Sequence, residues 1–118
     1  GLIKWSIPIY STNRFSITDK YLVNSWNDRV FIIKKKNGKL VFNKKLNNSK
    51  KYDGKTFYKD LIIGNNWIYV FDNNGFKTSL SKNNLRKYNR IKIGKNYQNS
   101  IIHKNNLYIN TKNSILKF

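Results

Sequence analysis

The sequence predicts an all-β fold, and composition gives the first reason. The 118 residues contain no Ala, Glu or Met, which are among the strongest helix formers. Aromatic residues make up 15% of the chain and Ile is common, and such ring-shaped and branched side chains pack well on a pleated surface. The second reason is a repeated hairpin pattern, and the third is a set of strands that are apolar at every position.

The hairpin pattern consists of two short apolar segments joined by a polar turn, and it occurs three times. The turns contain Asn, Asp and Ser, which tolerate tight backbone turns. The expected hairpins pair residues 19–24 with 29–33, residues 59–64 with 67–71, and residues 105–110 with 114–118.

Regularly spaced glycines support the repeat. Gly1, Gly38 and Gly75 stand 37 residues apart. Gly38 and Gly75 each follow Asn, and Asn-Gly after a strand is a strong hairpin signal. Trp5 and Phe42 each lie four residues after a glycine of this series. Four-stranded units of about 40 residues are typical of propeller blades.

Three expected strands are apolar at consecutive positions, namely residues 30–33, 61–63 and 68–71. A strand that is apolar on both faces must be covered on both faces, and propeller blades meet this condition because they stack face to face. We therefore expect a partial β-propeller, with about three four-stranded antiparallel blades. The blade-like units are expected at about residues 5–45, 46–82 and 83–118.

Residues 20–23, followed by residues 29–42, resemble the PQQ-like β-propeller repeat, in which a strand, a short turn, a second strand, an Asn-Gly or Asp-Gly turn and a closing aromatic recur. Trp5 and Phe42 lie where that family places its blade-docking tryptophan. Trp67 opens a strand that is expected to be buried, and Gly38 and Gly75 are expected to form the turns.

Residues 99–110 and 115–118 are similar to the last blade of the BamB family, lipoprotein scaffolds of outer-membrane β-barrel assembly. This resemblance implies that the chain is the C-terminal portion of an eight-bladed propeller. It also implies a periplasmic, outer-membrane-associated protein that binds the barrel-assembly machinery. The resemblance further implies an export signal in the full protein, which would lie upstream of Gly1.

Composition and spacing give no sign of an enzyme. His103 is the only histidine, and with no Cys the chain offers neither a disulfide nor a Cys-ligated zinc site. The sequence has no Gly-x-Ser-x-Gly elbow and no Gly-rich phosphate loop. We expect no catalytic, metal or cofactor site. The five acids fall in expected turns, where Asp caps its own backbone: Asp19, Asp28, Asp53, Asp60 and Asp72.

The net charge of +19 leaves other partners open. Twenty of the basic residues are Lys and four are Arg, whereas recognition of phosphates and bases favours Arg. Lys, Asn, Ile, Tyr and Phe also share AT-rich codons, so base composition alone would raise them together. A basic nucleic-acid- or ribosome-associated β-protein stays an alternative function, and a fragment of a PQQ-dependent dehydrogenase is another.

Two local features are candidates for contact with partners. Trp26, in the expected loop of residues 24–28, is the best candidate for an exposed contact residue, with packing at a blade edge as the alternative. Lys34–Lys36 and Lys44–Lys45, with Lys50–Lys51, flank one hairpin. They are interpreted either as a solvated edge that blocks edge-to-edge aggregation or as a contact with an anionic membrane surface.

Overall fold

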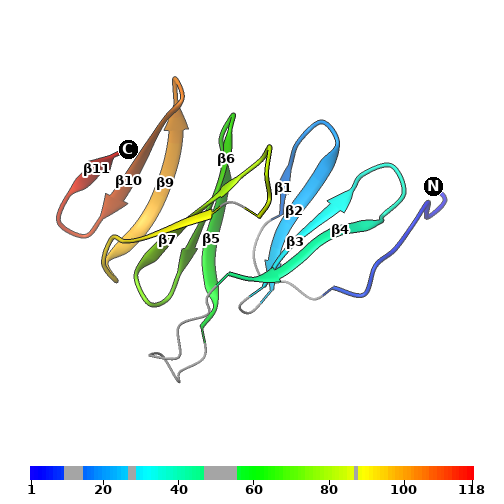
Figure 1. Ribbon diagram of the computed structural model, residues 1–118, viewed down its shortest axis with the longest axis horizontal. Helices are drawn as coiled ribbons and strands as arrows, with labels where there is room; N and C mark the ends of the chain where they lie inside the picture. Colours follow the sequence, from blue (N-terminus) through cyan, green and yellow to red (C-terminus); the bar gives the residue numbers. More distant parts are fainter. Residues whose placement is uncertain (10–14, 27–28, 47–55, 87) are drawn as a thin grey trace. The chain divides into compact units, whose positions relative to one another are not determined.

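The computed structural model describes residues 1–9, 15–26, 29–46, 56–86 and 88–118, and every regular element in these ranges is a β-strand (Figure 1). The prediction of an all-β fold is therefore confirmed for the described residues. The strands are β1 (Ser16–Ile17), β2 (Tyr21–Trp26), β3 (Arg29–Lys34), β4 (Leu40–Lys45), β5 (Tyr58–Ile63), β6 (Trp67–Asp72), β7 (Phe76–Ser81), β8 (Tyr88–Lys92), β9 (Tyr97–His103), β10 (Asn106–Thr111) and β11 (Ile115–Lys117).

The strands form three antiparallel sheets, and each sheet is a meander of strands consecutive in sequence. The orders are β1-β2-β3-β4, β5-β6-β7-β8 and β9-β10-β11. The chain divides into two compact units, Gly1–Tyr58 and Lys59–Phe118. The first sheet lies in the first unit, and the third sheet and nearly all of the second lie in the second unit. The arrangement of such sheets as propeller blades stays a prediction.

The three expected hairpins are confirmed as β2–β3, β5–β6 and β10–β11. They occupy different positions in their sheets, however. The hairpins β2–β3 and β10–β11 are the second and third strands of their sheets, whereas β5–β6 is formed by the first and second strands of its sheet. Gly38 precedes the fourth strand of its sheet, whereas Gly75 precedes the third. The reason is that a turn signal marks a hairpin without specifying which strands of a sheet it joins.

The second sheet also extends beyond the expected boundary between residues 82 and 83. Strand β8 pairs with β7, with Tyr88 opposite Leu80 and Lys92 opposite Phe76. The third sheet then begins at Tyr97 and has three strands.

The core of the first sheet is centred on β3, where all four residues from Val30 to Ile33 are buried. Successive side chains of a strand point to opposite faces, so both faces of β3 are buried, as its continuous apolar sequence predicts. Ile32 lies opposite Val23 on one side and Phe42 on the other, and both neighbours are buried too.

The second and third sheets pack face to face in the second unit and share one core (Figure 1). Phe71 of β6 and Leu107 and Ile109 of β10 are its fully buried members. The Phe71 ring stacks on the Tyr97 ring of β9, with 4.5 Å between ring centroids and 14° between ring planes. Partly buried side chains complete the contact, namely Ile62, Tyr69, Ile93, Tyr97, Ile102 and Leu116.

Both faces of the second sheet are buried along β6 and β7. Ile68 and Val70 lie opposite Leu80 and Thr78, on the face that points away from Phe71, and all four are buried. Within the described ranges, no helix is long and apolar enough to cross a lipid bilayer.

Candidate functional site

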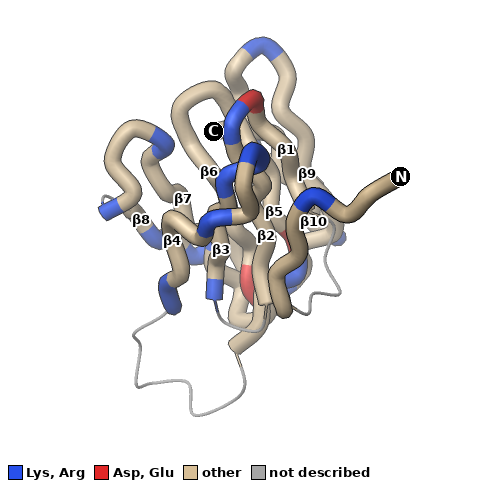
Figure 2. Tube along the Cα trace, turned by 90° about the vertical axis from the view of Figure 1, so that its right-hand side faces the viewer, with Lys and Arg blue, Asp and Glu red and all other residues tan. Residues whose placement is uncertain are grey.

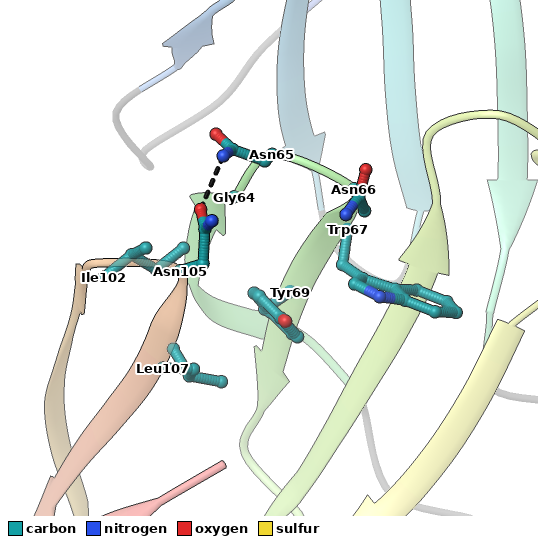
Figure 3. Close-up of a pocket in the computed structure, with 8 residues that line it drawn as sticks. All are labelled: Gly64, Asn65, Asn66, Trp67, Tyr69, Ile102, Asn105 and Leu107. Carbon is teal, nitrogen blue, oxygen red and sulfur yellow. Dashed lines mark hydrogen bonds between the residues drawn. The ribbon is translucent and has the colours of Figure 1, made fainter.

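A small pocket lies in the second unit, where the turn between β5 and β6 meets the turn between β9 and β10 (Figure 3). It is lined by Gly64, Asn65, Asn66, Trp67, Tyr69, Ile102, Asn105 and Leu107. The Asn65 amide donates a hydrogen bond to Asn105 Oδ1 across its mouth. Lys104 and Asn105 have positive φ angles of 48° and 64°, so this tight turn presents the Asn105 amide.

The pocket offers amide donors and acceptors beside aromatic rings. Its volume of about 80 Å³ is well below that of sites for cofactors and drug-sized ligands, which run from about 300 Å³ upward. A Cβ at Gly64 would lie 3.1 Å from Ile102 Cδ1, so the glycine lets the two turns approach. The arrangement suits a few water molecules or one small polar group.

A hydrogen-bonded cluster of Asp60, Tyr97 and Ser100 joins the second and third sheets. The Tyr97 hydroxyl donates to Asp60 Oδ2, and Ser100 Oγ lies 3.2 Å from the same phenol oxygen. Burial raises the pKa of Tyr97 strongly, and the hydrogen bond to Asp60 raises this pKa further. The phenol therefore keeps its proton past the pH at which an exposed tyrosine loses it, and it acts as a donor that ties the sheets together.

Two cations are held within the second unit by aromatic rings. Lys77 is only 4% exposed, and its ammonium lies 4.0 Å from the Phe118 ring centroid and 5.4 Å from that of Tyr69. Burial lowers the pKa of Lys77. Arg90 lies 3.6 Å from the Phe76 ring centroid.

Asp72 both caps a turn and forms an ion pair. Its Oδ1 accepts hydrogen bonds from the backbone N–H groups of Asn74 and Phe76, as expected for an Asp beside a turn. Its Oδ2 lies 3.2 Å from Arg90 Nη2, and the Asp72 side chain is only 1% exposed. Sequence reasoning missed this pair, and also the bond between Asp60 and Tyr97, because the partners lie 18 and 37 residues apart.

The first sheet carries an exposed aromatic and basic surface, which we call the Trp26 row and define as Trp26, Arg29 and Lys45. Trp26 lies opposite Arg29, and Arg29 opposite Lys45, and side chains directly opposite in antiparallel strands share a face. Trp26 is 41% exposed, and its ring stacks on Phe31 with centroids 6.5 Å apart. Arg29 Nη1 donates to Asn43 Oδ1 at 3.0 Å.

Of the residues singled out in the sequence, the structure brings Trp5 and Gly38 together. The Trp5 indole N–H donates to the Lys35 carbonyl at 2.9 Å. A Cβ at Gly38 would lie 2.7 Å from Trp5 Cδ2, and the φ of Gly38 is +72°, so glycine is needed there for two reasons. Phe42 is buried in β4. The blade-docking role of Trp5 and Phe42 stays a prediction.

The remaining candidates lie elsewhere. Trp67 opens β6 and lines the small pocket. Gly75 has a φ of +85°, and a Cβ there would lie 2.7 Å from the backbone of Gly94. Trp26, expected in a loop, is the last residue of β2. His103 is exposed at the end of β9.

The expected turns at Asp28 and Asp53, and the lysines Lys50–Lys51, lie outside the described residues. The expected turn at Asp60 is wrong, because Asp60 lies within β5, where its carboxylate accepts hydrogen bonds from the Leu61 N–H and the Tyr97 hydroxyl. Among the residues that are described, no group of three or more His, Cys, Asp or Glu side chains is placed to hold a metal ion.

The fold and these surfaces define an all-β protein built from consecutive antiparallel meanders. The chain matches no protein-family model, and no curated protein matches its sequence significantly.

Proposed function

We propose that the chain is a portion of a PQQ-like β-propeller that acts as a non-enzymatic scaffold binding other proteins. The observation that carries the proposal is the burial of β6 and β7 on both faces in a meander that packs on the next meander of the chain. Blades in a propeller need both properties, because each blade is covered by its two neighbours.

The connectivity supports the same architecture. In an immunoglobulin-like sandwich, successive strands cross between the two sheets in a Greek key. Here each sheet uses only strands that follow one another in the sequence, which is how a propeller blade is built.

The Trp26 row is the surface that suits a protein partner. Trp and Arg are enriched among the residues that contribute most to protein–protein binding. Trp26 is exposed, but its ring stacks on the Phe31 ring, and the Arg29 guanidinium donates a hydrogen bond to the Asn43 side chain. A contact surface that is already ordered loses less side-chain entropy on binding. By the resemblance to the BamB family, the partner is the barrel-inserting protein of the outer membrane, and the location is the periplasm.

Calorimetric titration of the 118-residue chain with the purified periplasmic part of that barrel-inserting protein tests the proposal. We expect saturable binding that Trp26→Ala weakens about tenfold or more, as for an interface hot spot. Tyr88→Ala is the matched control, because Tyr88 is 43% exposed and lies on β8 of the second unit. Absence of binding by the parent chain would reject this partner, and equal losses in both variants would reject the Trp26 row as the contact.

A further inference from the structure

A cluster of lysines gathers at the end of the first sheet that is opposite to the Trp26 row. Tyr21 pairs with Lys34 at this end of the β2–β3 hairpin, whereas Trp26 pairs with Arg29 at the other end. We call this surface the basic end and define it by the exposed residues Lys4, Lys20, Lys34, Lys35, Lys36 and Lys39.

Backbone hydrogen bonds hold two turns together at the basic end. The Lys35 N–H donates to the Lys20 carbonyl at 3.0 Å, which joins the turn before β2 to the turn after β3. The Lys34 N–H donates to the Lys39 carbonyl at 2.9 Å, which closes the β3–β4 turn. The lysines are therefore displayed by a fixed backbone and not by separate loops.

The N-terminal segment is attached to the same surface through Trp5. Its indole donates to the Lys35 carbonyl and its ring lies against Gly38. Leu2 and Ile3 are 95% and 85% exposed, and at about 3.5 Å per residue they lie within about 10 Å of Trp5 along the chain. Two fully solvated aliphatic side chains thus stand beside the lysines.

Charge at the basic end is nearly all of one sign. The acid nearest in sequence to these lysines is Asp19, next to Lys20. Figure 2 shows few acidic positions along the chain trace compared with basic ones. Protection of an exposed sheet edge does not account for this cluster, because Lys20, Lys35 and Lys36 lie in turns and not along an edge strand.

We infer that the basic end binds the surface of an anionic lipid bilayer. Clusters of four to eight basic residues are attracted to anionic lipid headgroups, and exposed aliphatic side chains next to them enter the boundary between headgroups and acyl chains. Single-stranded nucleic acid fits less well, because it calls for exposed aromatic rings on which bases stack. The exposed apolar side chains described at this end are aliphatic, namely Leu2, Ile3, Ile17 and Leu40, while the Trp5 ring is packed on Gly38.

Co-sedimentation of the 118-residue chain with vesicles tests the inference. We expect binding to phosphatidylcholine vesicles that contain about 30% phosphatidylglycerol, and none to pure phosphatidylcholine, since the attraction depends on anionic lipid. The triple substitution K34Q/K35Q/K36Q should lower the partition coefficient roughly hundredfold, at about fivefold per lysine.

The matched control K92Q/K95Q/K104Q removes three exposed lysines from the second unit. It leaves all six lysines of the basic end in place, so it should change the coefficient less than about threefold. Equal losses in the two triple variants, or equal binding to neutral vesicles, would overturn the inference.

A second variant tests the aliphatic contact without touching the charges. L2S/I3S should weaken vesicle binding roughly tenfold and leave its dependence on salt unchanged. An unchanged affinity would reject the insertion of these residues. Tighter binding to a single-stranded oligonucleotide than to the vesicles, lost with K34Q/K35Q/K36Q, would assign the basic end to nucleic acid instead. The inference stands apart from the proposed scaffold, because it uses the other end of the first sheet and needs no protein partner.

Discussion

The second and third sheets share one core but differ in how their two faces are covered. In the second sheet, Phe71 packs toward the third sheet while Val70 and Leu80, on the opposite face, are buried as well. In the third sheet, burial alternates along β10. Its outward face carries Ile101 and Ile115, which are 62% and 74% exposed.

This difference follows the strand sequences. Residues 67–71 are apolar throughout, whereas β10 alternates and places Asn106 and Asn110 on the outward face with Tyr108. Polar groups buried in a sheet that is covered on both faces need partners inside the protein, and in the second sheet Asp72 and Arg90 form an ion pair. Whether apolar residues in a strand are continuous or alternate therefore predicts whether two faces of the sheet are buried or one. A sheet buried on both faces then also needs polar partners in its interior.

Phe71→Ala should give the largest effect that separates the two sheets. It removes a fully buried ring that stacks on Tyr97 and contacts the third sheet, so we expect a loss of about 3–5 kcal/mol in the free energy of unfolding. Ile101→Ala, on the outward face of the third sheet, is the control and should cost less than about 0.5 kcal/mol.

Urea denaturation of the 118-residue chain, followed by tryptophan fluorescence, measures both changes. A similar loss in the two variants would mean that the outward face of the third sheet is covered in solution, and the contrast between the sheets would be lost.

Asp72→Asn should give a smaller but still large effect. The substitution leaves Arg90 without its carboxylate partner and weakens the acceptor for two turn N–H groups. Breaking a buried ion pair costs about 3–5 kcal/mol, and because the Arg90 side chain is 19% exposed we expect about 2–3 kcal/mol.

The corresponding turn of the third sheet supplies the comparison. Between β10 and β11, Thr111 Oγ1 accepts from the Ser114 N–H at 3.0 Å, and both residues take part in an exposed hydrogen-bonded turn. Thr111→Ala should therefore cost only about 0.5–1 kcal/mol. Thermal unfolding of both variants at neutral pH decides the matter, and equal shifts in Tm would contradict the idea that the second sheet depends more on its polar partners.

Much of this fold follows from sequence because the signals are local. The apolar runs at residues 30–33 and 68–71 predict strands buried on both faces, and the Asn-Gly pairs at Gly38 and Gly75 predict turns with positive φ. The position of each hairpin within its sheet could not be predicted from the sequence. Strand β8, for example, has no apolar run that would indicate a strand pairing with β7.

The polar partners were harder to predict than the strands. Tyr97 contacts Asp60, 37 positions away, and Lys77 contacts Phe118, 41 positions away. Nothing in the local sequence marks Tyr97 or Lys77 as a residue with such a partner. The basic end was visible as Lys34–Lys36, but its connection to Lys20 and Trp5 depends on backbone hydrogen bonds between distant turns.

Among the three substitutions in the core and its polar contacts, Tyr97→Phe should give the smallest effect, and the pH dependence of this effect makes the test specific. The hydroxyl ties the third sheet to Asp60 of the second, and hydrogen bonds to charged groups contribute about 1.5–3 kcal/mol, so for this half-buried cluster we expect a loss of about 1–2 kcal/mol. Burial and Asp60 raise the pKa of Tyr97 in the folded chain. The unfolded chain therefore loses this phenol proton first as pH rises past the ordinary tyrosine pKa of 10.0.

It follows that the contribution of Tyr97 is fully present below pH 10 and is lost as pH rises through the folded pKa. The lowered pKa of Lys77 acts in the opposite sense at alkaline pH, and the raised pKa of Tyr69 acts in the same sense as that of Tyr97. Both occur in the parent chain and in Y97F, so they cancel when the two are compared. The stability difference between parent and Y97F should thus be constant from pH 7 to pH 9 and shrink above pH 10, as measured by urea denaturation at each pH. A difference that stays constant above pH 10 would show that the Tyr97 hydroxyl is not buried against Asp60 in solution.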